Sequence, residues 1–297
     1  MSEILQEIIE ESGDFEAPNF GYSEDELKHH VAMGTIRAES FARRVVLKKK
    51  IGRKKRVIDE AFVKEVNAKH AFYYPGVAGT YRIDDETRIS GHQPTKAVHL
   101  PSVMYKFGHW LSQGVEKVGE GSGEIIPALE TAAGAYYALV FEHSPFDVAN
   151  KRTARTVINA TLMRACEEVH VGITIPPITV DEKYFTLAEL GKQYEMYGKL
   201  RMDPFMKGVL AAQETGQITA LELHFANIWL RNLQRRRDQL SQLKLKPGKN
   251  AADDLVWNAT NKRIGILEGY VEQQQGPKQV KKLVPDILHT SLYTVVA

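Results

Sequence analysis

The most informative segment of the chain is His143-Ser144-Pro145-Phe146-Asp147-Val148-Ala149-Asn150-Lys151-Arg152-Thr153-Ala154-Arg155. It joins two runs of apolar residues at helical spacing, so it predicts a loop that leads into the first turn of a helix. A helix N-terminus presents unpaired N–H donors and about half a positive charge, which suits phosphate. The start of the second run adds four side chains that bind anions: Asn150, Lys151, Arg152 and Arg155. We therefore expect a cradle for a polyanion here.

The same loop carries residues suited to acid–base and metal chemistry. His143 can take a proton from an attacking hydroxyl, and Asp147 can hold a divalent cation against phosphates. Base, cation ligand and cradle together indicate phosphoryl or nucleotidyl transfer. The alternative is a plain turn between helices with a solvated basic face. Basic residues in a first helical turn oppose the helix dipole by a few tenths of a kcal/mol, which favours the functional interpretation.

The composition is that of a soluble globular protein. The chain has 297 residues, 39 Lys+Arg against 37 Asp+Glu, a net charge of +2 and 43% hydrophobic residues. The longest apolar run, Tyr136 to Phe141, is far shorter than the ~18 to 20 residues that cross a bilayer, so we expect no membrane partner. The balanced charge argues against nucleic acid as a partner. Cys166 is the single cysteine, and we expect a cytoplasmic protein.

Periodicity predicts a mostly helical chain. Helices are expected after the Ser23/Glu26 capping box, from Asp59, and over 103–118, 127–142, 150–163, 219–243 and 254–275, with others from Ile4, Asp181 and Pro204. Residues 73–101 are rich in Gly and Pro and contain two β-favouring stretches, 80–83 and 87–89, which predict a small hairpin or flap. We divide the chain into an N-terminal helical extension (1–24), a main domain (25–243) and a C-terminal helical segment (244–297).

The loop resembles the signature of the Fic (filamentation induced by cAMP) family, whose usual form is His-Pro-Phe-x-Asp/Glu-Gly-Asn-Gly-Arg followed by x-x-Arg. Residues 139–143 resemble the helix that enters the loop, and residues 153–159 the helix that leaves it. The stretch 75–82 is similar to the segment before the family's flap, and Pro176-Pro177 with Pro204-Phe205 to its trailing part. The resemblance covers roughly residues 25 to 230. It implies an all-α, Fic-type helical bundle with a small β-hairpin flap.

The resemblance also implies roles for individual residues. His143 would deprotonate a Ser, Thr or Tyr hydroxyl of a target protein, Asn150 and Arg152 would hold phosphates, and Arg155 would complete the anion site. Three flap residues, Arg82, Ile83 and Ile89, would position an extended target segment as an added strand. Typical members transfer AMP from ATP to a protein, so ATP is the expected substrate and Mg²⁺ the expected metal.

The loop departs from the usual signature at three places. Ser144 is an extra residue between His143 and the Pro-Phe pair. The family's magnesium-binding acid falls on Val148, while Asp147 sits one place early. Ala149 and Lys151 replace two Gly, and Lys151 matches the Doc toxin branch, which transfers the terminal phosphate of ATP. The sequence therefore leaves three functions open: a protein adenylyltransferase, a Doc-like protein kinase, or a catalytically inactive Fic-fold binding or scaffold protein.

Many family members carry an inhibitory helix with the pattern Ser/Thr-x-x-x-Glu-Gly/Asn, whose Glu pairs with the second arginine of the signature. Ser12 and Glu16 have this spacing but precede Ala17-Pro18, and residues 29–34 have the context without the Glu. Either the enzyme lacks this brake or a regulatory partner protein supplies it. For the localisation, we expect the cytoplasm, and secretion as an effector is the alternative.

Overall fold

The computed structural model describes residues 22–47, 57–85, 93–117, 125–165, 211–212, 215–242 and 251–276. These residues form an all-α fold and contain no β-strand. The helices are α2 (Glu24–Leu47), α3 (Glu60–His70), α4 (Leu100–Lys117), α5 (Ile125–Tyr137), α6 (Asn150–Ala165), α10 (Thr219–Gln242) and α11 (Ala251–Gln275). A 3₁₀ turn, η1 (Ala97–His99), precedes α4, and a π-helical turn, η2 (Ala138–Glu142), follows α5. The helices predicted from Ile4, Asp181 and Pro204 lie outside the described residues.

Local capping fixes where α2 and α3 begin. The Ser23 backbone N–H and hydroxyl both donate to the Glu26 carboxylate, at 2.9 and 2.7 Å, and Glu26 N–H donates back to Ser23 Oγ. Asp59 accepts from Phe62 N–H at 3.0 Å as the N-cap of α3. Each contact satisfies an N–H that the first helical turn leaves unpaired. Both predicted helix starts are confirmed.

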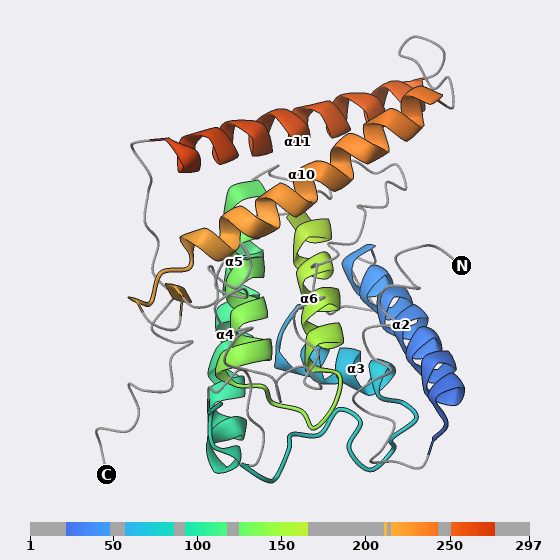
Figure 1. Ribbon diagram of the computed structural model, residues 1–297, viewed down its shortest axis with the longest axis vertical. Coiled ribbons are helices and arrows are strands. Elements are labelled where there is room, and N and C mark those ends of the chain that lie inside the picture. The colour runs from blue at the N-terminus through green and yellow to red at the C-terminus, as the bar shows by residue number, and fades with distance from the viewer. Residues whose placement is uncertain are drawn as a thin grey trace, which may run out of the picture.

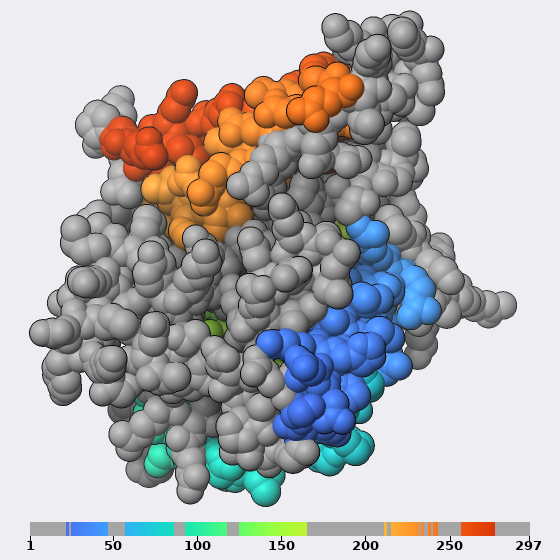
Figure 2. All heavy atoms as spheres, turned by 45° about the vertical axis from the view of Figure 1, so that its right-hand side comes forward, coloured from blue at the N-terminus to red at the C-terminus, as the bar shows by residue number. Residues whose placement is uncertain are grey.

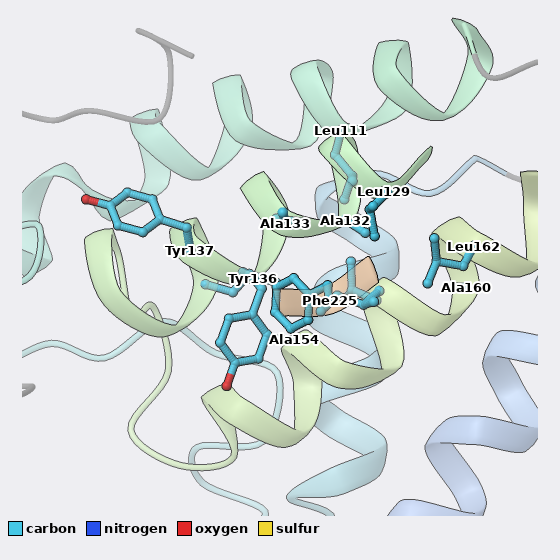
Figure 3. Close-up of a cluster of buried hydrophobic side chains, with 14 of the residues drawn as sticks. Leu111, Leu129, Ala132, Ala133, Tyr136, Tyr137, Ala154, Ala160, Leu162 and Phe225 are labelled. Atoms are coloured by element: carbon cyan, nitrogen blue, oxygen red, sulfur yellow. The ribbon is translucent and has the colours of Figure 1, made fainter. Parts of the chain in front are cut away.

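Helices α5 and α6 form the centre of the molecule (Figure 1). Helix α4 packs against α5, α2 and α3 pack against α6, and the pair α10 and α11 lies across the end of α5 (Figure 1). Figure 3 shows the buried side chains where α4, α5, α6 and α10 meet; Tyr136 and Phe225 are in contact there with ring centroids 5.3 Å apart. Helix α11, which falls in the predicted C-terminal segment, packs on α10 and α5.

Two glycines let helices approach the two ends of α3 closely. A Cβ added at Gly34 of α2 would lie 2.4 Å from the carbonyl oxygen of His70, and one at Gly108 of α4 would lie 2.5 Å from the backbone nitrogen of Glu60. Neither separation is compatible with a side chain, because the neighbouring atoms belong to helix backbone. Both positions require glycine, and the close approach of α2 brings its side chains up to the start of α6.

The predicted β-hairpin is wrong for the part of the flap that the structure describes. Residues 81–84 form no strand, and the second β-favouring stretch, 87–89, lies outside the described residues. Arg82 N–H instead donates to Pro145 C=O at 2.9 Å, and Thr95 N–H donates to Glu142 C=O at 2.8 Å. The flap backbone therefore pairs with the signature loop, which takes the place of a partner strand.

On the face shown in Figure 2, helix α2 and the pair α10 and α11 reach the surface. None of the described helices combines the length and the apolar character that crossing a membrane requires.

Candidate functional site

The chain enters the signature loop through a widened helical turn. His143 N–H donates to Ala138 C=O at 2.8 Å, which closes a π-helical turn that holds one residue more than an α-helical turn. Ser144 then turns the chain with a positive φ of 39°. With Pro145, Phe146 and Asn150 in the usual spacing, Ser144 stands where the family's signature has its histidine, and His143 is one place earlier. The local structure thus absorbs the extra residue on the N-terminal side of the loop.

The imidazole of His143 is fixed and fully buried. Thr95 Oγ1 donates to Glu142 C=O at 3.1 Å, so at 2.9 Å from His143 Nδ1 it accepts a proton from that nitrogen. This tautomer places the ring's lone pair on Nε2, the atom a general base needs. The ring also meets Phe107 edge to face, with centroids 6.3 Å apart, and is 0% exposed. An incoming hydroxyl can reach Nε2 only after the surrounding side chains move.

Arg82 points inward and holds the loop. Its guanidinium donates to the backbone carbonyls of His143, Ser144, Thr95 and Asp84, and the residue is 2% exposed. Arg82 was predicted to position a target segment, but its side chain is turned into the protein, with four hydrogen bonds from the guanidinium to backbone carbonyls of the flap and loop. The inward direction of Arg82 could not be predicted from the sequence, because all of its carbonyl acceptors except that of Asp84 are distant in sequence.

The other flap residues divide between exposed and undescribed positions. Ile83 is 93% exposed and follows the buried Arg82 directly, so its side chain is accessible to a partner. Ile89 lies outside the described residues. Ile83 therefore remains the one predicted flap residue with an accessible side chain in the described part of the chain.

Asp147 lies at the exposed tip of the loop. Partial burial raises the pKa of its carboxyl, the nearby Asp84 carboxylate raises it further, and Arg82 lowers it. A hydrated Mg²⁺ takes one or two carboxylates and completes its shell with water and substrate phosphate, so Asp147 has the chemistry of such a ligand. Within the described residues there is no group of three His, Cys, Asp or Glu side chains that could hold a metal by themselves. A metal here would depend on the nucleotide for its remaining ligands.

Val148, which stands where the family has its acid, is a packing residue. Its side chain is buried in a cluster formed with α2 and the end of α3: Leu27, Val31, Ala32, Ala71, Tyr73 and Tyr74. The exchange of acid for valine therefore matches the local surroundings, since a carboxylate at this position would be buried among apolar groups. The loop rests on this cluster.

Ala149 and Asn150 shape the beginning of α6. Ala149 has a φ of 64°, in the left-handed region where the usual signature has glycine. Asn150 Oδ1 accepts from Phe146 N–H at 3.0 Å and its Nδ2 donates to Phe146 C=O at 2.6 Å. The Asn150 amide thereby closes the loop on itself and directs the N-terminus of α6.

The predicted anion-binding arginines lie on the first two turns of α6, and both are buried. Arg152 Nη1 donates to Tyr73 Oη at 2.9 Å, and Arg152 and Arg155 are 4% and 7% exposed. Lys151 is half-buried. The structure thus brings the basic residues of the cradle onto one helix end, next to the loop that carries His143.

Asn67 on α3 was not identified from the sequence, although it joins three segments around the loop. Its side chain is fully buried: Nδ2 donates to Val148 C=O at 2.9 Å and to Thr153 Oγ1 at 3.2 Å, and Oδ1 accepts from Gly79 N–H at 2.9 Å. Asn67 therefore ties loop, helix and flap together. An asparagine on the apolar side of a predicted helix is the signal that could have marked it.

A second unpredicted network links α2, α3 and α6. Thr156 Oγ1 donates to Glu39 Oε1 at 2.8 Å and lies 3.0 Å from His70 Nε2, so His70 donates to the threonine. Burial lowers the pKa of His70 well below its usual value, and Arg152 and Arg155 lower it further. Burial also raises the pKa of the Glu39 carboxyl. His70 is a neutral donor beside two cations.

Glu39 also matches a family pattern that the sequence analysis did not find. Thr35 and Glu39 have the spacing of the Ser/Thr-x-x-x-Glu inhibitory pattern, with Ser40 in place of the final Gly or Asn. The Glu39 side chain reaches α6 at Thr156, the residue after Arg155. The Thr35-x-x-x-Glu39 pattern is visible in the sequence, but its contact with α6 is known only from the packing of α2 on α6.

Comparison with known proteins gives partial matches to Fic proteins. No family model matches the chain. The chain is 38% identical over 92 residues to a protein adenylyltransferase Fic from Nematostella vectensis, a match that covers 31% of this chain and 19% of that protein. It is 30% identical over 134 residues to the protein of the same name from Drosophila virilis, covering 44% and 23%. A third, from Drosophila grimshawi, is 39% identical over 77 residues, covering 26% and 14%.

The matched segments thus span about a fifth of the length of the first curated relatives. Their identities and shared name support a relationship to the Fic family and to protein adenylyl transfer. ATP is the substrate that an adenylyltransferase implies.

Proposed function

We propose that this chain is a Fic-type protein adenylyltransferase, which moves AMP from ATP to a hydroxyl side chain of a target protein. The observation that carries the proposal is the loop itself: an imidazole with its proton fixed on Nδ1 stands at one end, and the arginine-bearing start of α6 stands at the other. The similarity to proteins named Fic adenylyltransferases supports the same chemistry.

In the proposed reaction the target hydroxyl oxygen attacks the α-phosphorus of ATP. His143 Nε2 takes the hydroxyl proton, an O–P bond forms to the target, and the bond to pyrophosphate breaks. Arg152 and Arg155 stabilise negative charge on the phosphates. When bound, Mg²⁺ would neutralise charge on the departing pyrophosphate, and Asp147 with Asp84 would hold it. Because His143 is fully buried, the proposal includes an opening of the contacts that Arg82 makes with the loop.

A catalytically inactive Fic fold that serves as a binding or scaffold protein is the second candidate. It is favoured by the burial of His143 and by the apolar surroundings of Val148. Because Lys151 matches the Doc branch, a Doc-like kinase is the third candidate.

The proposed partner is an extended segment of the target protein. It would bind at the exposed part of the flap near Ile83.

Labelled ATP separates these functions. The purified chain is incubated with Mg²⁺, a cell lysate and ATP that carries label at either the α or the γ phosphorus. Transfer of the α label to protein supports adenylyl transfer, and transfer of the γ label supports a kinase. If neither label is transferred and calorimetry detects no ATP binding, the inactive fold is supported.

Matched variants test the assigned residues. His143→Ala and Arg152→Ala should each abolish transfer, because they remove the base and a phosphate ligand. His109→Ala and Arg231→Ala are the controls, since both residues are exposed and lie on α4 and α10. α label that survives both site substitutions would refute the assigned site.

A further variant tests whether Glu39 inhibits the enzyme, as the Glu of the inhibitory pattern does. If it does, Glu39→Gln should increase transfer of the α label. Unchanged transfer, with the fold intact by circular dichroism, would show that Glu39 does not inhibit the chain.

A further inference from the structure

Tyr73 lies three residues after the end of α3, and its hydroxyl contacts the side chain of Arg152. Arg152 Nη1 donates to Tyr73 Oη at 2.9 Å, across a separation of 79 residues in the sequence. Both residues are buried, at 6% and 4% exposure. A hydrogen bond from a charged donor in a buried setting is stronger and more directional than one at the surface. The hydroxyl therefore stands where it can fix the direction of the guanidinium.

The ring that carries this hydroxyl is itself held from several sides. His30 of α2 stacks on it with centroids 5.3 Å apart and planes at 13°, Tyr74 lies at 4.4 Å, and Phe72 meets it edge to face at 5.4 Å. The Tyr22 hydroxyl donates to the backbone carbonyl of Tyr73 at 2.9 Å, so the direction of the ring is set by its aromatic neighbours and not by this bond. A ring packed in this way has little rotational freedom, so the position of its hydroxyl is set by the fold.

We propose that Tyr73 is a positioning residue for Arg152: it holds the guanidinium at the start of α6 in the orientation that receives a phosphate of the nucleotide. The proposal rests on the proposed function for the identity of the anion. The physical reason is preorganisation. An arginine side chain has many rotamers, and a partner that selects one before the ligand arrives removes that ordering from the cost of binding.

The comparison of Tyr73→Phe with Tyr22→Phe tests this role. Each substitution removes one hydroxyl and keeps the ring, both in the same aromatic cluster, but only the first removes a contact with Arg152. We expect Tyr73→Phe to weaken the binding of ATP about tenfold, in line with the loss of a hydrogen bond to a charged group. Tyr22→Phe should leave the dissociation constant within a factor of two. Calorimetric titration with ATP and Mg²⁺ measures both.

A readout on the guanidinium itself keeps the test independent of activity. Chain labelled with ¹⁵N-arginine gives side-chain resonances, and Arg152→Lys identifies the one from Arg152. In Tyr73→Phe we expect the Arg152 guanidinium to rotate faster and its N–H protons to exchange faster with water. In Tyr22→Phe we expect wild-type values for both. If rotation and proton exchange of the Arg152 guanidinium are the same in the two variants, the proposal is overturned.

The two measurements distinguish failure of this inference from failure of the proposed function. If wild-type chain does not bind ATP, the proposed function fails, while a selective loosening of Arg152 still supports the positioning role. If ATP binds and Tyr73→Phe weakens it no more than Tyr22→Phe does, the function stands and the positioning role is refuted. In an Arg152→Lys background, Tyr73→Phe should cause no further loss of affinity.

Discussion

Replacing Val148 by the acid that the family carries at this place tests how the loop is seated. The Val148 side chain is buried beside residues of α2 and the end of α3. Val148→Asp removes an apolar contact surface worth about 1.5 to 3 kcal/mol. To remain buried at pH 7 the introduced carboxyl must also be protonated, and moving it from a pKa near 3.9 to above 7 costs about 4 kcal/mol at 1.36 kcal/mol per unit.

The two contributions sum to about 6 kcal/mol, which is an upper value because the loop can shift. This is comparable with the whole stability of many domains. Val148→Asn is the matched control, since it has the same shape and loses the same apolar surface without a titrating group. We therefore expect a gap of up to about 4 kcal/mol in the free energy of unfolding between the two variants at pH 7, measured by urea titration of tryptophan fluorescence.

The gap should depend on pH in a defined direction. The folded-state pKa of the introduced carboxyl is raised above its unfolded value, so the folded state binds more protons and gains stability as the pH falls. The gap should narrow by about 1.4 kcal/mol per unit between pH 7.5 and 5.5. Equal stability of Val148→Asp and Val148→Asn at both pH values, together with stabilisation of the former by Mg²⁺, would show that the side chain faces solvent and a metal, contrary to the structure.

Three further predictions concern the same region. Ala149→Gly should raise the melting temperature by about 2 to 4 °C, since relief of a left-handed alanine, about 1 to 2 kcal/mol, exceeds the entropy that glycine loses on folding; a lower melting temperature by calorimetry would contradict a φ of 64°. Asn67→Asp should lose about 2 kcal/mol or more of unfolding free energy, because a carboxylate cannot donate to Val148 C=O or Thr153 Oγ1; an unchanged urea midpoint would exclude this clamp. The depressed pKa of His70 means that the unfolded chain binds more protons below about pH 6.5, so stability should fall between pH 7 and 5 by up to about 1.4 kcal/mol per unit. His70→Gln should flatten that decrease, and an identical slope in wild type and variant would rule His70 out as its source.

Local interactions explain which parts of the fold were predictable. The capping box of Ser23 and Glu26 and the N-cap at Asp59 involve residues three positions apart, so their pattern is visible in the chain itself. The helix predicted over 219–243 is observed as Thr219–Gln242 for the same reason. Periodicity also placed α6 at Asn150, the residue that opens it.

The flap was mispredicted because its hydrogen bonds are not local. The stretch 80–83 has the composition of a strand, yet the backbone N–H of Arg82 and part of its guanidinium donate to carbonyls at residues 143–145, about sixty positions later. Propensity describes how a segment would pair, and the partner is set by tertiary packing. The inward direction of Arg82 follows from that partner.

Three features were predictable from the residues alone: the described chain is helical, a loop rich in basic residues opens a helix, and this loop resembles the Fic signature. Those features follow from side-chain spacing and from the chemistry of adjacent residues. Other features depend on packing: His143 is buried with its Nδ1–H donating to Thr95 Oγ1, Val148 packs against α2, and Asn67 and Tyr73 hold the loop and Arg152. Each of these depends on contacts between segments some 48 to 121 residues apart, and the free energy that selects such contacts exists only once the helices have packed together.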